Sequence, residues 1–131
     1  MSENSIAFHH NHLISEDPKS AALWYSEKLG GRILGGEKAL DGPSVLVTFK
    51  GVILIIRKQN EGEEVSAKKG VEWGMDHFGF HIDGDFDGYC DDLKKIGVTF
   101  TLDPVDISPT TRIAFITGPD NLSIELLQNK Q

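Results

Sequence analysis

The second half of this chain repeats the first. A shift of 67 residues, the interval between His10 and His77, aligns the two halves. The shift also matches Lys28 with Lys95, Gly30 with Gly97, Val47 with Ala114 and Gly51 with Gly118. Few of the matched residues are identical, but both halves keep one order of strand, helix and further strands. A shared order of elements predicts two copies of a single structural module.

Each half begins with a candidate strand. In the second half, residues 75–82 alternate between apolar and other side chains, a period typical of a strand with one packed face. His77 and His81 fall on the face opposite the apolar residues. In the first half, His10 and His12 share one face of the corresponding strand.

A helix is predicted after each of these strands. Asp17 can cap the first helix, Pro18 suits its first position, and Gly30 suits a left-handed stop. In the second half Asp85 can cap the helix and Gly97 can end it. Both helices should therefore span about ten residues, as is common in globular domains.

Strand-like segments return after each helix. They are residues 31–35, 45–50 and 52–57 in the first half, and 99–102, 112–117 and 122–128 in the second. The predicted fold class is α+β, with two βαβββ modules. Module 1 covers about residues 5–58 and module 2 about residues 75–128, joined by a charged, glycine-containing linker at residues 59–74. The 131 residues fit one domain, 1–131.

Charge and composition exclude several classes of function. The net charge of −7 argues against a nucleic-acid-binding protein, which needs a basic surface. The longest apolar run, residues 52–56, is far shorter than the roughly 20 residues that span a membrane. With one cysteine, Cys90, no internal disulfide can form. The single thiol and the absence of a signal-peptide pattern predict a cytoplasmic protein.

All five histidines lie in two short windows, residues 9–12 and 77–81, at equivalent places in the two halves. Imidazole is the commonest metal ligand among side chains and binds zinc, iron, nickel and copper. Two strands related by the repeat could each supply one histidine to a shared ion. His10 and His77 are the candidates, because the repeat places one on the other.

A third ligand should be anionic, and Glu125 is the natural candidate. In the segment 122–128, Ile124 and Leu126 fall on one face and Glu125 falls on the other. A carboxylate in the middle of such a strand is costly unless a cation or a partner offsets its charge. We therefore expect one divalent metal held by His10, His77 and Glu125, with further coordination positions open.

The remaining polar candidates have two interpretations each. His12 and His81 could move protons near the metal, or could simply line the site. Arg112 opens a strand of the second module and could bind an anionic substrate or lie on the surface. Cys90 lies on the apolar stripe of the second helix, which favours core packing over nucleophilic catalysis.

The sequence resembles the vicinal oxygen chelate superfamily over nearly its whole length, from about residue 6 to residue 128. The segments that carry the resemblance are His10 to Asp17, Trp24 to Gly30, Met75 to His81, Arg112 to Asn121 and Ile124 to Leu126. The superfamily includes glyoxalase I, methylmalonyl-CoA epimerase, fosfomycin thiol transferases, bleomycin resistance proteins and extradiol dioxygenases. The resemblance implies paired βαβββ modules forming a cup-shaped mixed sheet, a metal in the cup, a small-molecule substrate and commonly a homodimer.

The ligand set implied by the resemblance separates the subfamilies. His10, His77 and Glu125 match superfamily metal positions. A fourth ligand, often Glu or Gln, belongs on the segment 52–57, where Ile55, or Leu54 in a shifted register, stands in this sequence. Neither side chain can bind a metal, and this speaks against glyoxalase I and the epimerase.

Two subfamilies keep a set of two histidines and one glutamate. Extradiol dioxygenases hold ferrous iron there, but Phe115 stands where they carry a tyrosine, and His81 is the last histidine of this chain. Fosfomycin thiol transferases hold manganese and carry a serine-rich potassium loop, which residues 108–112 match poorly. Bleomycin-type binding proteins generally lack the ligands.

The expected function is therefore a metal-dependent, dioxygenase-like enzyme acting on a small oxygen-bearing substrate. A glyoxalase-like or transferase-like enzyme and a binding protein without catalysis are the alternatives. The metal is Fe²⁺, Mn²⁺, Ni²⁺ or Zn²⁺. Arg112 and Phe115 are the candidate substrate-binding residues.

Overall fold

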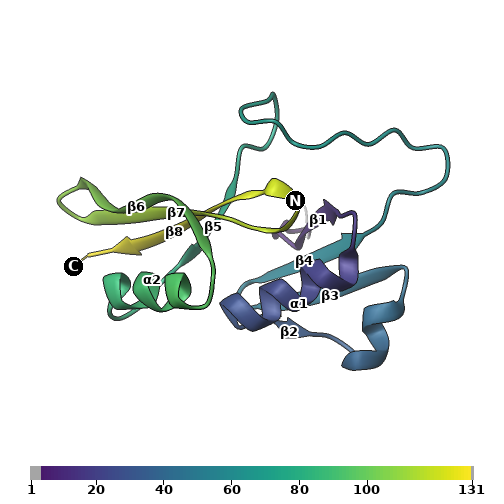
Figure 1. Ribbon diagram of the computed structural model, residues 1–131, viewed down its shortest axis with the longest axis horizontal. Coiled ribbons are helices and arrows are strands. Elements are labelled where there is room, and N and C mark those ends of the chain that lie inside the picture. Colours follow the sequence, from purple (N-terminus) through teal and green to yellow (C-terminus); the bar gives the residue numbers. More distant parts are fainter. Residues whose placement is uncertain (1–3, 131) are drawn as a thin grey trace. The chain divides into compact units, whose positions relative to one another are not determined.

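The computed structural model describes residues 4–130 and divides into two compact units, the first ending at Val65 and the second beginning at Ser66. Each unit contains a strand, a helix and three further strands in that order (Figure 1). This confirms the prediction of two βαβββ modules.

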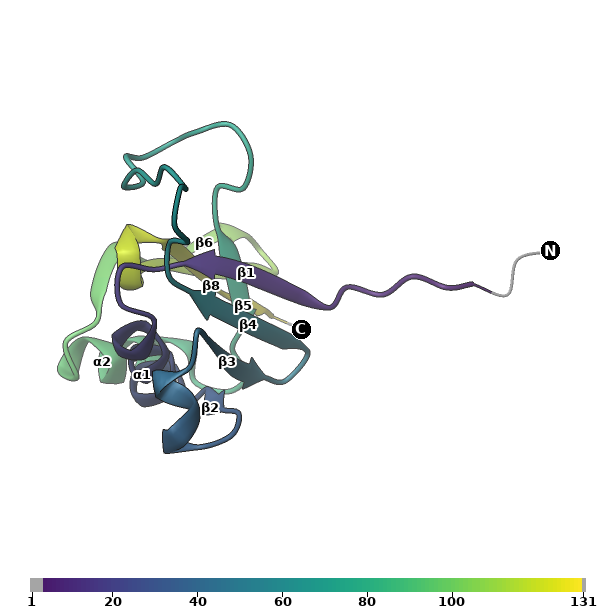
Figure 2. The same ribbon diagram turned by 90° about the vertical axis from the view of Figure 1, so that its right-hand side faces the viewer.

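Unit 1 is built on a four-stranded sheet with the order β1-β4-β3-β2. Its elements are β1 (His10–Ile14), α1 (Pro18–Leu29), β2 (Arg32–Ile33), the short 3-10 helix η1 (Glu37–Asp41), β3 (Ser44–Phe49) and β4 (Val52–Arg57). β1 runs parallel to β4, whereas the other neighbours are antiparallel. Figure 2 shows β1 alongside β4.

Unit 2 repeats this topology with the strand order β5-β8-β7-β6. Its elements are β5 (Phe78–His81), α2 (Phe86–Lys95), β6 (Thr99–Ser108), β7 (Thr111–Thr117), the 3-10 turn η2 (Pro119–Asn121) and β8 (Ser123–Asn129). β5 runs parallel to β8, as β1 does to β4. The two units therefore match strand by strand.

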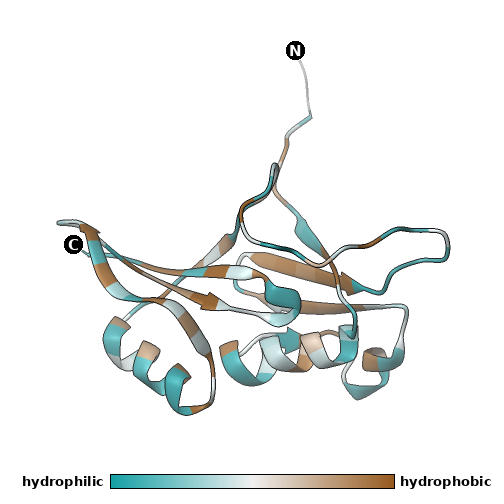
Figure 3. Ribbon diagram, turned by 45° about the horizontal axis from the view of Figure 1, so that its top comes forward, coloured by the Kyte–Doolittle hydropathy of each residue, from teal (hydrophilic) through white to brown (hydrophobic). Residues whose placement is uncertain are grey.

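One face of each sheet forms a core with the helix of the same unit. The fully buried positions alternate along the central strands, as period-2 patterning requires. They are Val45, Val47, Leu54 and Ile56 in unit 1, and Ala114, Ile116, Ile124 and Leu126 in unit 2. Figure 3 shows these strands as long hydrophobic stretches. The residues between these buried positions point away from the helix and can form a functional site.

The helix boundaries agree with the sequence signals. The Asp17 carboxylate accepts a hydrogen bond from the Ser20 backbone N–H at 3.1 Å, and Gly30 adopts a left-handed φ of 79°. In unit 2 the Asp85 carboxylate accepts a hydrogen bond from the Gly88 N–H at 3.0 Å. Both caps were therefore predicted correctly.

Three strands differ in length from the sequence expectation. β2 has only two residues, and β5 covers only Phe78–His81 of the expected segment 75–82. β6 extends through Pro104 to Ser108 with several register shifts. A proline is tolerated there because β6 lies at the edge of its sheet, where a missing N–H leaves no ladder bond unmade.

The segment 59–74, expected to be a linker, makes hydrogen bonds with unit 1 in its first part and with unit 2 in its second part. The Glu63 carboxylate accepts two hydrogen bonds from the Arg57 guanidinium at the end of β4, at 2.8 and 3.1 Å. The Asn121 side-chain amide donates to the Lys68 carbonyl at 3.1 Å. Among residues 4–130, no helix combines the length and hydrophobicity needed to cross a membrane.

Candidate metal site

The candidate ligands of unit 2 lie side by side on the sheet face that points away from α2. Glu125 sits in the middle of β8, and His77 lies immediately before β5. The distance between His77 Nε2 and Glu125 Oε1 is 3.4 Å. Their side chains are 31% and 19% exposed, so both are partly sheltered but reachable from solvent.

Gly79 provides the space for the Glu125 side chain. The two residues are register partners in the parallel β5–β8 pair. A Cβ atom on Gly79 would lie 3.3 Å from the Glu125 Cβ and 3.2 Å from its carbonyl oxygen, a tight fit for any larger residue. The glycine therefore lets the carboxylate stand beside β5.

Two neighbours hold the His77 ring. His77 Nδ1 lies 2.9 Å from Asp76 Oδ2. The ring also meets Phe115 edge to face, with ring centroids 4.9 Å apart and planes at 84°. Phe115, the predicted substrate-binding residue, thus lies directly against a candidate metal ligand.

The unit 2 pair fits a divalent metal. Donors at about 2.1 Å from one ion in tetrahedral geometry are about 3.4 Å apart, and the His77–Glu125 separation equals this value. An imidazole and a carboxylate suit iron, manganese, nickel and zinc. Among residues 4–130, no three His, Cys, Asp or Glu side chains are grouped so that they could hold a metal.

His10 occupies the equivalent position in unit 1. His10 and His12 share the exposed face of β1, with ring centroids 6.0 Å apart, as strand alternation predicted. The Nδ1 atom of His10 lies 2.8 Å from Nδ1 of His9. His9 lies just before the first residue of β1, where strand alternation does not apply.

The register identifies Ile55 as the unit 1 counterpart of Glu125. His12 pairs with Ile55 in the β1–β4 ladder, and Gly79 pairs with Glu125 in the β5–β8 ladder. Because His10 corresponds to His77, His12 corresponds to Gly79, and Ile55 therefore corresponds to Glu125. Ile55 is only partly buried, whereas Leu54 is fully buried on the α1 side. Unit 1 thus has an apolar side chain where unit 2 has a carboxylate.

His81 makes two polar contacts at the far end of β5. Its Nδ1 lies 3.4 Å from an Asp83 carboxylate oxygen, and its Nε2 accepts a hydrogen bond from the Asn129 backbone N–H at 3.3 Å. His81 shares a strand face with His77, as expected. Its ring nitrogens are engaged in local contacts, so a proton-transfer role requires that one of these contacts open.

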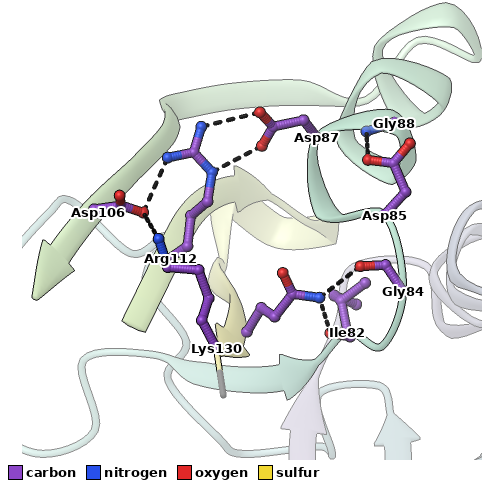
Figure 4. Close-up of polar contacts among 9 residues, drawn as sticks. Ile82, Gly84, Asp85, Asp87, Gly88, Asp106, Arg112 and Lys130 are labelled. Carbon is purple, nitrogen blue, oxygen red and sulfur yellow. Dashed lines mark hydrogen bonds and ion pairs between the residues drawn. The ribbon is translucent and has the colours of Figure 1, made fainter. Parts of the chain in front are cut away.

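Arg112 lies on the opposite side of the sheet from Phe115. Its guanidinium binds the Asp87 carboxylate of α2 through two hydrogen bonds of 2.8 and 3.0 Å, and Asp106 through one of 3.1 Å (Figure 4). The Arg112 hydrogen bonds hold the pKa of Asp87 below its ordinary value. Lys130 and Arg112 together lower the pKa of Asp106. The expected substrate role of Arg112 gains no support from this position.

Cys90 is fully buried under the sheet, on the core side of α2. Burial raises the pKa of its thiol to about 11, so the sulfur is protonated at neutral pH. The sequence interpretation of Cys90 as a core residue agrees with this burial.

Sequence reasoning missed the contacts that Asp76 and Gly79 make with the candidate ligands. Strand alternation assigned Asp76 to the face opposite His77, although both residues precede β5, where the chain is irregular. Gly79 carried a usable signal, since a glycine inside a strand often marks a close approach by a neighbouring group.

A probable lactoylglutathione lyase of Vibrio cholerae is 40% identical over 65 residues, which cover 49% of this chain and 45% of that protein. The chain thus matches less than half the length of this relative.

Solved structures share the fold at lower identity. A glyoxalase/dioxygenase from Nostoc punctiforme has a TM-score of 0.75 at 20% identity, covering 99% of this chain and 100% of that one. TnmS3, an antibiotic binding protein from Streptomyces sp. CB03234, has a TM-score of 0.72 at 21% identity, covering 98% and 100%. The model of the Glyoxalase/Bleomycin resistance protein/Dioxygenase superfamily matches residues 7–126. The chain therefore belongs to this superfamily.

Proposed function

We propose that this chain is a metal-dependent enzyme that binds a small substrate through adjacent oxygen atoms. The observation that carries the proposal is the His77–Glu125 pair, with Nε2 and Oε1 3.4 Å apart on the open face of unit 2. An imidazole and a carboxylate at this separation suit one divalent cation.

We assign the third ligand to His10. The assignment rests on the repeat, because His10 lies two residues before the ladder partner of Ile55 and His77 lies two residues before the ladder partner of Glu125. Three protein ligands leave coordination positions for substrate oxygens. A divalent metal there would act as a Lewis acid that stabilises negative charge on oxygen.

The residues around the pair favour a substrate with an apolar body. Phe115 lies against His77, and the half-buried Leu127 lies two residues beyond Glu125 on the same face of β8. These side chains would pack against a ring or an alkyl group while the oxygens face the metal.

Among reactions of this type, a dioxygenase-like reaction fits best. Ile55 cannot be a fourth ligand, so the set stays at two histidines and one glutamate, with room for oxygen and substrate together. Both atoms of O₂ would enter a ring-cleaved product, so no separate reductant is needed. His12 and His81 are the proton-transfer candidates. We place the reaction in the cytoplasm and expect a homodimer.

The first test is metal stoichiometry. Protein purified without a histidine tag should hold about one metal per chain after loading with Fe²⁺ under anaerobic conditions, or with Mn²⁺, Ni²⁺ or Zn²⁺. The variants His10→Ala, His77→Ala and Glu125→Ala should lose the metal. Asp91→Ala, which removes an exposed carboxylate of α2, should keep it. If His77→Ala and Glu125→Ala hold metal as the wild type does, the proposed site is wrong.

The second test concerns the reaction. The iron-loaded protein should consume O₂ in the presence of a catechol, and Glu125→Ala should not. If O₂ uptake is absent but lactoylglutathione turns over, a lyase-type reaction, suggested by the Vibrio relative, replaces the dioxygenase-like one.

A binding protein without catalysis is the second candidate. It is favoured by the shared fold of TnmS3, which is an antibiotic binding protein. A protein that holds no metal, shows no rise in melting temperature on adding these metals, and still binds an aromatic ligand would support this candidate.

A further inference from the structure

We propose that Asp76 is a positioning residue that fixes the His77 ring with Nε2 free to bind the metal. The inference rests on the proposed metal site and adds a residue to it. The contact between Asp76 Oδ2 and His77 Nδ1 is 2.9 Å long, within hydrogen-bond range. It joins two consecutive residues just before β5.

The chemistry of this contact determines which ring nitrogen carries the proton. An ionised carboxylate only accepts hydrogen bonds, so His77 Nδ1 must be the donor. In the neutral ring, the lone pair then lies on Nε2, the nitrogen that faces Glu125 at 3.4 Å. A metal-binding histidine typically donates its other N–H to a carboxylate or carbonyl in this way.

The rest of the ring's surroundings support the same orientation. Phe115 contacts the His77 ring edge to face and limits its rotation. Asp76 is more exposed than His77, with 58% of its side chain open against 31%. An exposed aspartate contributes little to the core, so its removal should leave the fold intact.

The test compares two aspartates that contact histidines. In Asp76→Ala we expect the metal affinity to fall about 10- to 100-fold, as for other residues that orient a metal-bound histidine. Asp83→Ala removes the same charge beside His81, with a contact of 3.4 Å, and should leave the affinity unchanged. Asp76→Asn keeps a neutral acceptor and should recover part of the affinity. Mn²⁺ titration followed by electron paramagnetic resonance measures all three.

A second measurement works without metal. Nitrogen-15 NMR of the His77 ring should show the proton on Nδ1 in the wild type and in Asp83→Ala. In Asp76→Ala the proton should move, at least in part, to Nε2. Circular dichroism confirms that each variant is folded.

The two proposals fail in different ways. If His77→Ala loses the metal while Asp76→Ala binds it as tightly as the wild type, the role of Asp76 is overturned and the metal site stands. If His77→Ala binds Mn²⁺ normally, the metal site itself is wrong, and the positioning role falls with it. An unchanged His77 proton position in Asp76→Ala also contradicts the inference.

Discussion

The two units carry different chemistry on the same framework. At equivalent positions of the paired strands, unit 1 has His10 and Ile55, and unit 2 has His77 and Glu125. The core side is apolar in both units. The difference between Ile55 and Glu125 lies on the opposite face, where a substitution can change the chemistry without disturbing the packing under the helix.

The units also differ in how they hold their histidines. In both, the residue before the histidine contacts its Nδ1, at 2.8 Å in unit 1 and 2.9 Å in unit 2. In unit 1 the partner is His9, an imidazole that can either donate or accept. In unit 2 it is Asp76, which only accepts and so selects one tautomer. The contact in unit 2 therefore favours one tautomer of the histidine ring, whereas the contact in unit 1 does not.

The largest expected effect tests whether the two cores are equivalent. Ile56 and Leu126 follow Ile55 and Glu125 and are fully buried. Ile56→Ala and Leu126→Ala should each lower the free energy of unfolding by about 2–5 kcal/mol, because each leaves a cavity. Urea unfolding measures both. A loss under about 1 kcal/mol in only one variant would contradict equal packing of the two units.

The second prediction removes the chemical difference between the units. Glu125→Ile gives unit 2 the residue that unit 1 carries, so the metal should be lost. A metal at 100 times its dissociation constant stabilises the fold by about 2.7 kcal/mol. The melting temperature of the wild type should therefore rise on metal addition, and that of Glu125→Ile should not. Ile55→Val is the control and should respond as the wild type does.

The third prediction tests the close approach at Gly79. Gly79→Ala should destabilise unit 2 by about 1–3 kcal/mol, because the added methyl group crowds the Glu125 backbone and Cβ. His12→Ala changes the equivalent position of unit 1, which is exposed, and should cost within about 0.5 kcal/mol. Thermal unfolding compares the two variants. Equal losses would show that Gly79 is not specially constrained.

The smallest effect on stability is expected at Arg112, which lies on the face opposite the candidate metal ligands. Arg112→Met should lower the stability at pH 7 by removing the partner of Asp87 and Asp106. The pKa of each carboxyl is lowered in the folded state, so its stabilising effect is present above the unfolded pKa of about 3.9.

That contribution disappears as the pH falls through the folded pKa, below about 4. The difference in melting temperature between Arg112→Met and the wild type should therefore be clear at pH 7 and shrink toward pH 2–3. Metal binding at pH 7 should be unchanged. If Arg112→Met loses the metal, Arg112 influences the metal site despite lying on the other face of the sheet.

Period-2 alternation predicted the strand faces on which the candidate ligands lie. It placed His77 and Glu125 on the face opposite Phe78 and Ile124, and it placed His10 with His12. The same rule could have excluded Arg112 from the site, since Arg112 shares the parity of Ala114 and Ile116, which pack under α2.

Other features lie outside what a periodic pattern can express. The Asp76–His77 contact forms in the irregular segment before β5, where neighbouring side chains need not point apart. The Arg112–Asp87 ion pair joins a strand to a helix 25 residues away, through the packing of α2 on the sheet. β6 can include Pro104 because it is an edge strand. The local sequence does not predict which strand lies at the edge, because the order of strands depends on the whole fold.

The burial of Cys90 makes the chain well suited to site-specific labelling. Its thiol is shielded from solvent and stays protonated at neutral pH, so maleimide reagents should not react with it in the native state. A cysteine introduced at an exposed position such as Asp83 would then be the reactive thiol. A fluorophore or spin label could be attached there without first replacing the natural cysteine.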